Sequence, residues 1–171
     1  GQVKPDEVYN LAAQSHVRIS FDMPIFTSQT NAIGAMHVID AVKTHRPDCK
    51  YYQASSSEMF GNSVDEDGMQ RESTPLTPVS PYGIAKVFAY NTVRHYRHAY
   101  KMHATNGILF NHESPRRGSN FVTVKVVKTA VQIKKGLADK LVLGNMDSMR
   151  DWGHSKDYVK AMWMMMQQDD P

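Results

Sequence analysis

The sequence is poor in cysteine and lacks long apolar runs, and each absence excludes a class of protein. Cys49 is the only cysteine among the 171 residues, which excludes an internal disulfide framework and fits a reducing compartment. No apolar run approaches the roughly 20 residues that cross a bilayer, and no signal peptide is recognisable. We therefore expect a cytoplasmic protein with no membrane partner.

Charge of one sign and several familiar site motifs are also scarce. The net charge is only +3, and the basic residues cluster only in the pairs Lys134-Lys135 and Arg116-Arg117, which are typical of a solvated surface. We therefore expect no nucleic-acid partner. His95 and His98 share a helix face, but no cysteine or carboxylate stands at a ligand spacing, so we expect no metal. A CxxC motif, a serine nucleophile elbow and a glycine-rich phosphate loop are absent.

What the sequence does contain is typical of a globular protein. Hydrophobic residues make up 41% and charged residues 22%, and the length suffices for one domain with a core. The chain begins at Gly1 without a methionine and ends at Pro171 just after a helical pattern. We expect it to be an internal piece of a longer polypeptide.

Strand and helix patterns alternate along the chain. A β-prone run over residues 7–13 is followed by helical spacing from Pro24 to about Arg46, which Pro47 ends, and by a strand over 50–54. This β–α–β order favours a parallel sheet with right-handed crossovers. The further expected elements are a polar loop over 62–79, a helix from Pro81 to about Tyr100, a strand over 104–110, a helix over 121–135 stopped by Gly136, a short strand over 141–143, and a helix from Ser155 to about Gln168 whose methionines (Met162, Met164, Met165, Met166) we interpret as core packing.

One helix start carries a candidate acid–base pair. Ser80 is a suitable N-cap and Pro81 suits the first helical position, so Tyr82 and Lys86 lie four residues apart on one face. A phenol ordinarily titrates near pH ~10, and an adjacent ammonium group lowers that pKa. The pair predicts a base for a sugar or alcohol hydroxyl, although an isolated Tyr and Lys at this spacing also occur on ordinary amphipathic helices.

Polar clusters follow three of the predicted strands. They comprise Gln14-Ser15-His16, Ser55-Ser56-Ser57-Glu58 and the run from Asn111 to Gly118. In a parallel sheet the carboxyl ends of strands meet at one edge, where open α/β proteins bind ligands. Each cluster also has a plain structural interpretation as a capped or solvated turn. We expect the three clusters to converge with the Tyr82–Lys86 pair.

In these runs the chain resembles the extended short-chain dehydrogenase/reductases, and within them the family of the GDP-mannose 4,6-dehydratases. The most specific run is Asn111 to Gly118, whereas Y-x-x-x-K marks only the superfamily. The matching segments cover essentially the whole chain and comprise Asn10 to Val17, Tyr52 to Glu58, Ser80 to Lys86, Gly107 to Gly118, and Leu143-Gly144-Asn145 through Arg150-Asp151-Trp152-Gly153.

The resemblance implies four catalytic residues. Tyr82 would be the base at the 4-hydroxyl of the sugar, and Lys86 would lower its pKa and hold the cofactor ribose. Ser56, where many relatives carry Thr, would bind the same hydroxyl. Glu58 would remove the C5 proton and help the 6-hydroxyl leave as water.

It also implies NADP as cofactor and GDP-mannose as substrate. The implied cofactor contacts are Leu11, Ala12, Ala13, Gln14, Ser15, Phe26 (where relatives often have Tyr), Tyr82, Lys86, His112 and Arg117. The implied substrate contacts are Ser15, Ser56, Glu58, Asn111, Lys125 and Arg150. The reaction would be a lyase step to GDP-4-keto-6-deoxymannose, feeding the synthesis of GDP-fucose or other deoxysugars.

For the architecture, the resemblance implies a Rossmann-like, doubly wound parallel sheet that is incomplete at both ends. Residues 1–120 would be the central and C-terminal part of an NADP-binding domain whose glycine-rich turn precedes residue 1. Residues 121–171 would begin the substrate-binding region, and the full-length protein would form a homodimer or homotetramer. We expect this segment alone to bind NADP poorly and to expose unpaired strand edges.

Three alternatives remain open. Another nucleotide-sugar epimerase or dehydratase of the superfamily is one, although an epimerase needs no carboxylate at Glu58, and the dTDP-glucose enzymes pair Asp with Glu where Ser57 stands here. A nucleotide-binding module without catalysis is the second, although such modules commonly lose the Tyr or the Lys. An inactive fragment is the third.

Overall fold

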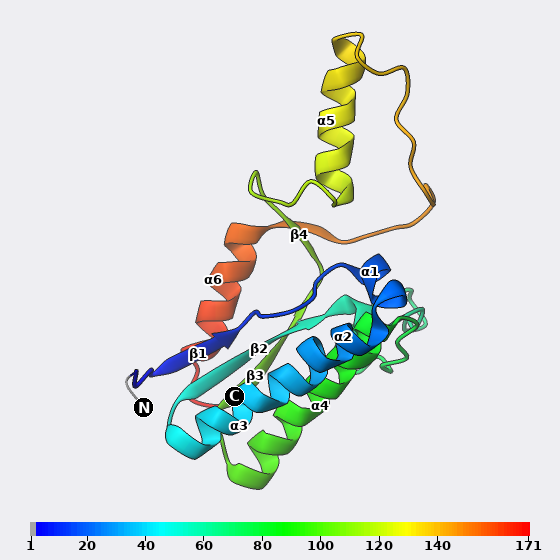
Figure 1. Cartoon of the computed structure of the whole chain (residues 1–171). Helices are drawn as coiled ribbons and strands as arrows, with labels where there is room; N and C mark the ends of the chain where they lie inside the picture. Colours follow the sequence, from blue (N-terminus) through cyan, green and yellow to red (C-terminus); the bar gives the residue numbers. More distant parts are fainter. Residues whose placement is uncertain (1–2) are drawn as a thin grey trace. The chain divides into compact units, whose positions relative to one another are not determined.

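The structure is a computed structural model that describes residues 3–171 and divides into two compact units (Figure 1). The first unit runs to Leu109 and includes Lys160–Pro171, and the second is Phe110–Val159. The functional division into residues 1–120 and 121–171 stays a prediction. No helix in residues 3–171 is both long and apolar enough to cross a membrane.

A three-stranded parallel sheet forms the centre of the first unit. Its strands are β1 (Glu7–Asn10), β2 (Lys50–Ser56) and β3 (Ala104–Leu109), in the order β1-β2-β3. Tyr9 stands opposite Tyr52, and Ala54 opposite Gly107. The predicted parallel α/β class is confirmed, because helices supply the crossovers between strands that run in one direction.

The first unit contains the predicted helices together with two short helical elements that the sequence did not predict. After β1 come α1 (Val17–Asp22), α2 (Pro24–Ser28), a π-helix η1 (Gln29–Ile33) and α3 (Gly34–His45); after β2 come a 3₁₀ turn η2 (Ser57–Met59) and α4 (Pro81–Tyr100). The sequence predicted one continuous helix from Pro24, but the backbone widens into a π-turn midway. The short helix α1 was not predicted.

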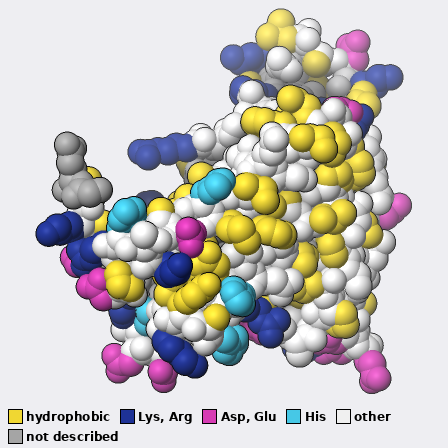
Figure 2. Space-filling model, turned by 60° about the horizontal axis from the view of Figure 1, so that its bottom comes forward, with side chains coloured by type: hydrophobic (Ala, Val, Ile, Leu, Met, Phe, Trp, Pro, Cys, Tyr) yellow, Lys and Arg dark blue, Asp and Glu magenta, His cyan; other side chains and the backbone are white. Residues whose placement is uncertain are grey.

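Helices α3 and α4 lie side by side against one face of this sheet (Figure 1). Their contact with the strands buries a cluster made of Ile39, Val42, Cys49, Tyr51, Val93, Tyr96, Met102 and Ala104. This cluster is the core that fixes α4, and with it the start of α4, relative to β2. Outside this cluster, α2 exposes Ile25 and α4 exposes Ile84 and Phe88. Figure 2 shows apolar side chains scattered among polar ones over one face.

The last helix, α6 (Ser155–Met166), returns to the first unit at its C-terminal end. The Lys50 ammonium donates to the carbonyl oxygens of Met166 (2.8 Å) and Gln168 (2.9 Å). Met162 and Met166, one helical turn apart, are buried, whereas Met164 is half exposed. The interpretation of these methionines as core is therefore right for one helix face and wrong for Met164.

The second unit contains a two-stranded parallel sheet and one long helix. Strand β4 (Asn111–Glu113) pairs with β5 (Trp152–His154), and α5 (Val122–Lys134) lies between them in the sequence. Gly136 follows α5 with φ +69°, as a helix stop requires. The strand predicted over 141–143 is wrong, because this segment pairs with no other strand among residues 3–171 and Val142 is 62% exposed.

Candidate active site

The start of α4 has the predicted capping geometry. The Ser80 hydroxyl accepts a hydrogen bond from the Gly83 amide at 3.0 Å, and Pro81 occupies the first turn. Tyr82 and Lys86 follow on one face of the helix, and both side chains are buried. The fold therefore buries this pair at a helix start that the Ser80 cap defines.

Burial and one hydrogen bond define the state of Lys86. Its ammonium donates to the Ala54 carbonyl oxygen at 2.8 Å and lies 5.7 Å from the centroid of the Tyr82 ring. Desolvation by burial lowers the pKa of Lys86 from 10.5 to about 8, since the interior disfavours the charged form. Burial therefore brings the pKa of Lys86 closer to neutral pH than that of an exposed lysine.

The polar cluster after β2 folds into the 3₁₀ turn η2. The Ser56 hydroxyl caps this turn by accepting a hydrogen bond from the Glu58 amide at 3.2 Å. Ser56 is buried and Glu58 is partly exposed. The plain interpretation of this cluster as a serine-capped turn is confirmed, and it leaves the Ser56 O–H hydrogen available to a ligand because the oxygen acts as the acceptor.

Gly83 brings the helix and the turn together. A Cβ on Gly83 would lie 2.6 Å from the Glu58 carbonyl oxygen and 3.0 Å from the Pro78 Cβ, so the backbones of α4 and η2 are in direct contact. Ser56, Glu58, Tyr82 and Lys86 therefore lie around one backbone contact at the carboxyl end of β2. This is the edge of a parallel sheet where ligands bind.

The segment after β1, Leu11–Ser15, lies at the same edge because β1 is the neighbour of β2. The side-chain amide of Asn10 donates a hydrogen bond to Gln53 Oε1 at 2.9 Å, which anchors the beginning of the Leu11–Ser15 segment. Further on, Asn31 pairs with the backbone of Gln14. The sequence analysis missed Asn31, whose only signal is a polar residue within an apolar helical pattern. Leu11 and Phe26 are half exposed.

The remaining predicted site residues belong to the second unit. The His112 ring lies 4.9 Å from the Tyr158 ring, and its Nδ1 donates to the Phe110 carbonyl oxygen at 2.9 Å, because a carbonyl can only accept. The Arg117 guanidinium lies 3.3 Å from the Glu113 carboxylate and stacks 3.6 Å from the Phe121 ring centroid. These contacts hold the His112 and Arg117 side chains in fixed orientations.

Asn111, Lys125 and Arg150 are held less firmly within that unit. The Asn111 backbone amide donates to Asp151 at 3.2 Å in the β4–β5 pairing, which leaves its side chain for other contacts. Lys125 is exposed on α5, and the exposed Arg150 donates to the Met149 carbonyl oxygen at 2.7 Å. The structure thus gathers the four predicted catalytic residues in one unit and these five residues in the other.

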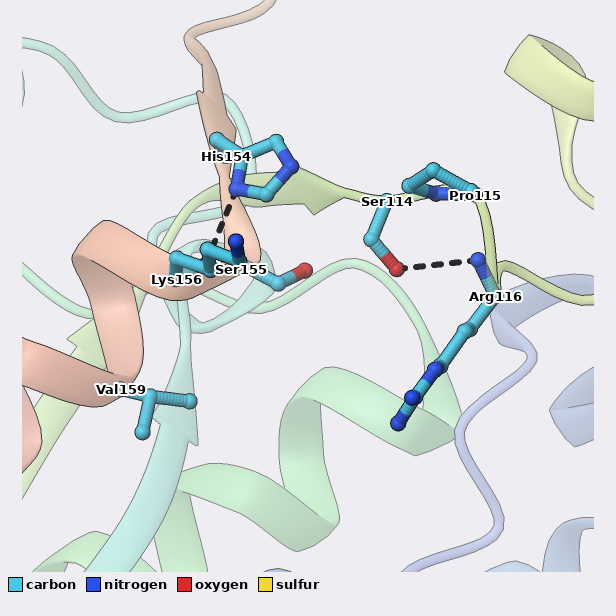
Figure 3. Close-up of a pocket in the computed structure, with 7 residues that line it drawn as sticks. All are labelled: Ser114, Pro115, Arg116, His154, Ser155, Lys156 and Val159. Carbon is cyan, nitrogen blue, oxygen red and sulfur yellow. Dashed lines mark hydrogen bonds between the residues drawn. The ribbon is translucent and has the colours of Figure 1, made fainter.

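A pocket of about 570 Å³ lies within the second unit (Figure 3). It is lined by Ser114, Pro115, Arg116, His154, Ser155, Lys156 and Val159. Two backbone amides close local turns at its wall, from Arg116 to the Ser114 hydroxyl and from Lys156 to His154 Nδ1, both at 3.2 Å. Ser114, Pro115 and Arg116 belong to the predicted Asn111–Gly118 cluster, although none of the lining residues was assigned a cofactor or substrate contact. Across residues 3–171, no group of three or more His, Cys, Asp or Glu could hold a metal.

Comparison with known proteins identifies the family of the chain. Residues 1–171 match the family described as GDP-mannose 4,6 dehydratase. The GDP-mannose 4,6-dehydratase of Yersinia enterocolitica is 52% identical over 172 residues, which are 99% of this chain and 46% of the relative. The relative from Homo sapiens gives the same four values. The chain therefore spans about half the length of the curated relatives it matches.

A solved structure shares the fold. RMD from Pseudomonas aeruginosa, in a complex with NADPH, is 26% identical with a TM-score of 0.89, over 97% of this chain and 57% of that one. This likeness and the parallel sheet confirm the predicted Rossmann-like α/β fold. From its sequence match over all 171 residues, the chain belongs to the GDP-mannose 4,6-dehydratase family.

Proposed function

We propose that the full-length protein containing this chain converts GDP-mannose to GDP-4-keto-6-deoxymannose and water, with NADP as cofactor. The observation that carries this proposal is the contact between α4 and η2 at Gly83, which places a buried Tyr82–Lys86 pair next to Ser56 and Glu58. Relatives that are about half identical and carry the dehydratase name support the same reaction.

The residues present suit a nicotinamide dinucleotide. The Lys86 ammonium has three N–H donors and uses one on the Ala54 carbonyl oxygen, so two remain for ribose hydroxyls. Ala12 and Ala13 have short side chains at the sheet edge, which permits close approach to the backbone. The NADPH complex of RMD supports the choice of NADP. A nicotinamide held by these residues would supply reversible hydride transfer between the cofactor and the sugar carbons C4 and C6.

Tyr82 takes the proton of the 4-hydroxyl on its phenol oxygen as C4 is oxidised to a ketone. Lys86 beside the ring favours the phenolate form, as the sequence predicts. Ser56 donates its O–H to the same sugar oxygen, since its own oxygen already accepts the Glu58 amide. Tyr82 and Ser56 thereby orient the C4–O bond and carry its proton.

Glu58 performs the step that makes the reaction a dehydration. The C4 ketone acidifies the C5 hydrogen, and the Glu58 carboxylate removes it as a proton. The same carboxyl group then protonates the 6-hydroxyl, which leaves as water and produces a C5–C6 double bond. Glu58 ends ionised, as it began, so one carboxylate acts first as base and then as acid. The return of hydride to C6 leaves an enolate that takes up one proton at C5, which balances the proton that Tyr82 accepted from the 4-hydroxyl.

The test uses the full-length protein with GDP-mannose and NADP⁺, followed by detection of a 4-keto-6-deoxy sugar nucleotide. We expect Glu58→Gln to abolish the product while NADP⁺ binding is kept, and the exposed Glu72→Gln to leave the rate unchanged. Undiminished product formation by Glu58→Gln would show that Glu58 is not the group that removes the C5 proton. A 4-epimer product without loss of water would point to an epimerase, and a protein that binds NADP⁺ without turnover to a non-catalytic module.

A further inference from the structure

Asn31 forms a two-way amide contact with the backbone of Gln14. The Gln14 amide donates to Asn31 Oδ1 at 2.8 Å, and Asn31 Nδ2 donates to the Gln14 carbonyl oxygen at 2.9 Å. Asn31 is 1% exposed, so neither bond competes with water. The contact fixes the backbone of Gln14 as a paired strand would, although residues 11–15 have no strand partner.

The side chain of Gln14 is also fully engaged. Its Oε1 accepts the His16 amide at 2.6 Å, and its Nε2 donates to the His16 carbonyl oxygen and the Thr27 hydroxyl, both at 3.1 Å. Thr27 is completely buried. Every polar group of Gln14 therefore has a hydrogen-bond partner within the chain, and all three of its N–H hydrogens are used.

The helical segment that contains Thr27 and Asn31 has two unusual features, a buried asparagine in its interior and a π-turn. Thr27 lies in α2 and Asn31 in the π-helix η1, and asparagine is a poor former of helix interiors. Buried polar side chains need partners, and the hydrogen bonds of the Asn31 side chain within residues 3–171 both go to Gln14. Single π-turns are frequent at functional sites.

We propose that Asn31 and Thr27 are positioning residues that lock Gln14, and that this lock holds the Leu11–Ser15 segment in the conformation that binds the cofactor. Gln14 then acts on the cofactor through the shape of the segment, and the direct contacts fall to its neighbours. This inference rests on the proposed function, and it changes the expected role of Gln14 from a contact to a brace.

The first measurement is the Kd of the full-length protein for NADP⁺ by titration calorimetry. Asn31→Ala loses both bonds to Gln14 and should weaken binding about tenfold, from two lost hydrogen bonds. Asn31→Asp keeps the acceptor for the Gln14 amide but turns a second oxygen toward the Gln14 carbonyl oxygen, so it should weaken binding at least as much as Asn31→Ala. Thr27→Val, of nearly the same shape, should weaken binding by a smaller factor. In all three, KM for NADP⁺ should change more than kcat.

The matched control is Asn106→Ala. Asn106 also makes two side-chain hydrogen bonds in the first unit, accepting from the Ser55 hydroxyl at 3.1 Å and donating to the Tyr90 carbonyl oxygen at 3.2 Å, but it does not touch residues 11–15. We expect its Kd for NADP⁺ to equal that of the wild type. If Asn31→Ala and Asn106→Ala bind NADP⁺ equally well, the proposed lock is overturned.

Hydrogen exchange of the Gln14 amide gives a readout that needs no cofactor. The amide should be protected in the wild type and in Asn106→Ala, and exchange faster in Asn31→Ala. An unprotected Gln14 amide in the wild type overturns the lock itself. A protected amide in a wild type that binds no NADP⁺ overturns the proposed function and the cofactor role of the lock, but leaves the local structure standing.

Discussion

The Glu58 carbonyl oxygen lies 2.6 Å from the position that a Cβ on Gly83 would take. Real Cβ atoms do not come this close to an oxygen, so α4 can pack on the η2 turn only with glycine at this position. The contact sets the spacing between the two parts of the candidate site. Glu58 and Tyr82 come from segments 24 positions apart in the sequence, and this glycine lets them meet.

Gly83→Ala should push α4 away from η2. We expect a loss of stability of about 1–3 kcal/mol from overpacking, together with a loss of dehydratase activity larger than the loss of NADP⁺ affinity. Urea unfolding and the rate of product formation measure the two effects. Gly144→Ala is the control, because nothing lies within 4 Å of a Cβ there. Wild-type behaviour of Gly83→Ala would mean that α4 shifts freely against the turn.

Removal of the hydroxyl group should change the free energy of unfolding differently at two neighbouring buried tyrosines, Tyr51 and Tyr52. The Tyr51 hydroxyl donates to Gln53 Oε1 at 2.7 Å and accepts from Asn10 at 3.2 Å, whereas the buried Tyr52 hydroxyl has no hydrogen-bond partner among the described residues. Tyr51→Phe should therefore lower the free energy of unfolding by about 1–2 kcal/mol, and Tyr52→Phe should keep or raise it. Denaturant melts of both variants decide this. Equal destabilisation would show that the Tyr52 hydroxyl is satisfied in solution.

Ser80→Ala should weaken the start of α4. The Ser80 hydroxyl accepts the Gly83 amide, and loss of an N-cap typically costs about 1 kcal/mol. Since Tyr82 lies in the first turn, we also expect a lower rate of product formation. The exposed Ser119→Ala serves as the control for both measurements. A Ser80→Ala protein as stable and active as the control would mean that packing alone fixes the helix start.

Lys86 should make stability depend on alkaline pH. Its pKa is about 8 in the folded chain against an ordinary 10.5, so between these values the folded chain has released a proton that the unfolded chain still binds. The free energy of unfolding therefore rises with pH in this window. The stability that the deprotonated Lys86 contributes is lost as the pH falls to about 8. Relative to Lys86→Met, the wild type should gain stability from pH 8 to 10. Parallel pH profiles of the two proteins would contradict the lowered pKa.

The elements that local signals specify were predicted well. Ser80-Pro81 marks the start of α4 and Gly136 the stop of α5, because caps depend on the chemistry of single residues. The strands at β2 and β3 follow from β-prone runs. Strand β4 was missed because its three polar residues lack an apolar pattern, and it exists only through pairing with β5, about 40 positions away. The strand predicted at 141–143 fails for the converse reason, since it finds no partner.

By itself the sequence determined the strand–helix alternation from β1 to β3, the capped Tyr82–Lys86 pair and the family resemblance, because each depends on the spacing of residues close in the chain. The tertiary structure decided the rest. It placed Glu58 against Gly83, lowered the pKa of Lys86 by burial, and engaged all the polar groups of Gln14 with Asn31, Thr27 and His16. Burial, close contact and hydrogen-bond pairing arise between segments far apart in the sequence, so local pattern does not determine them.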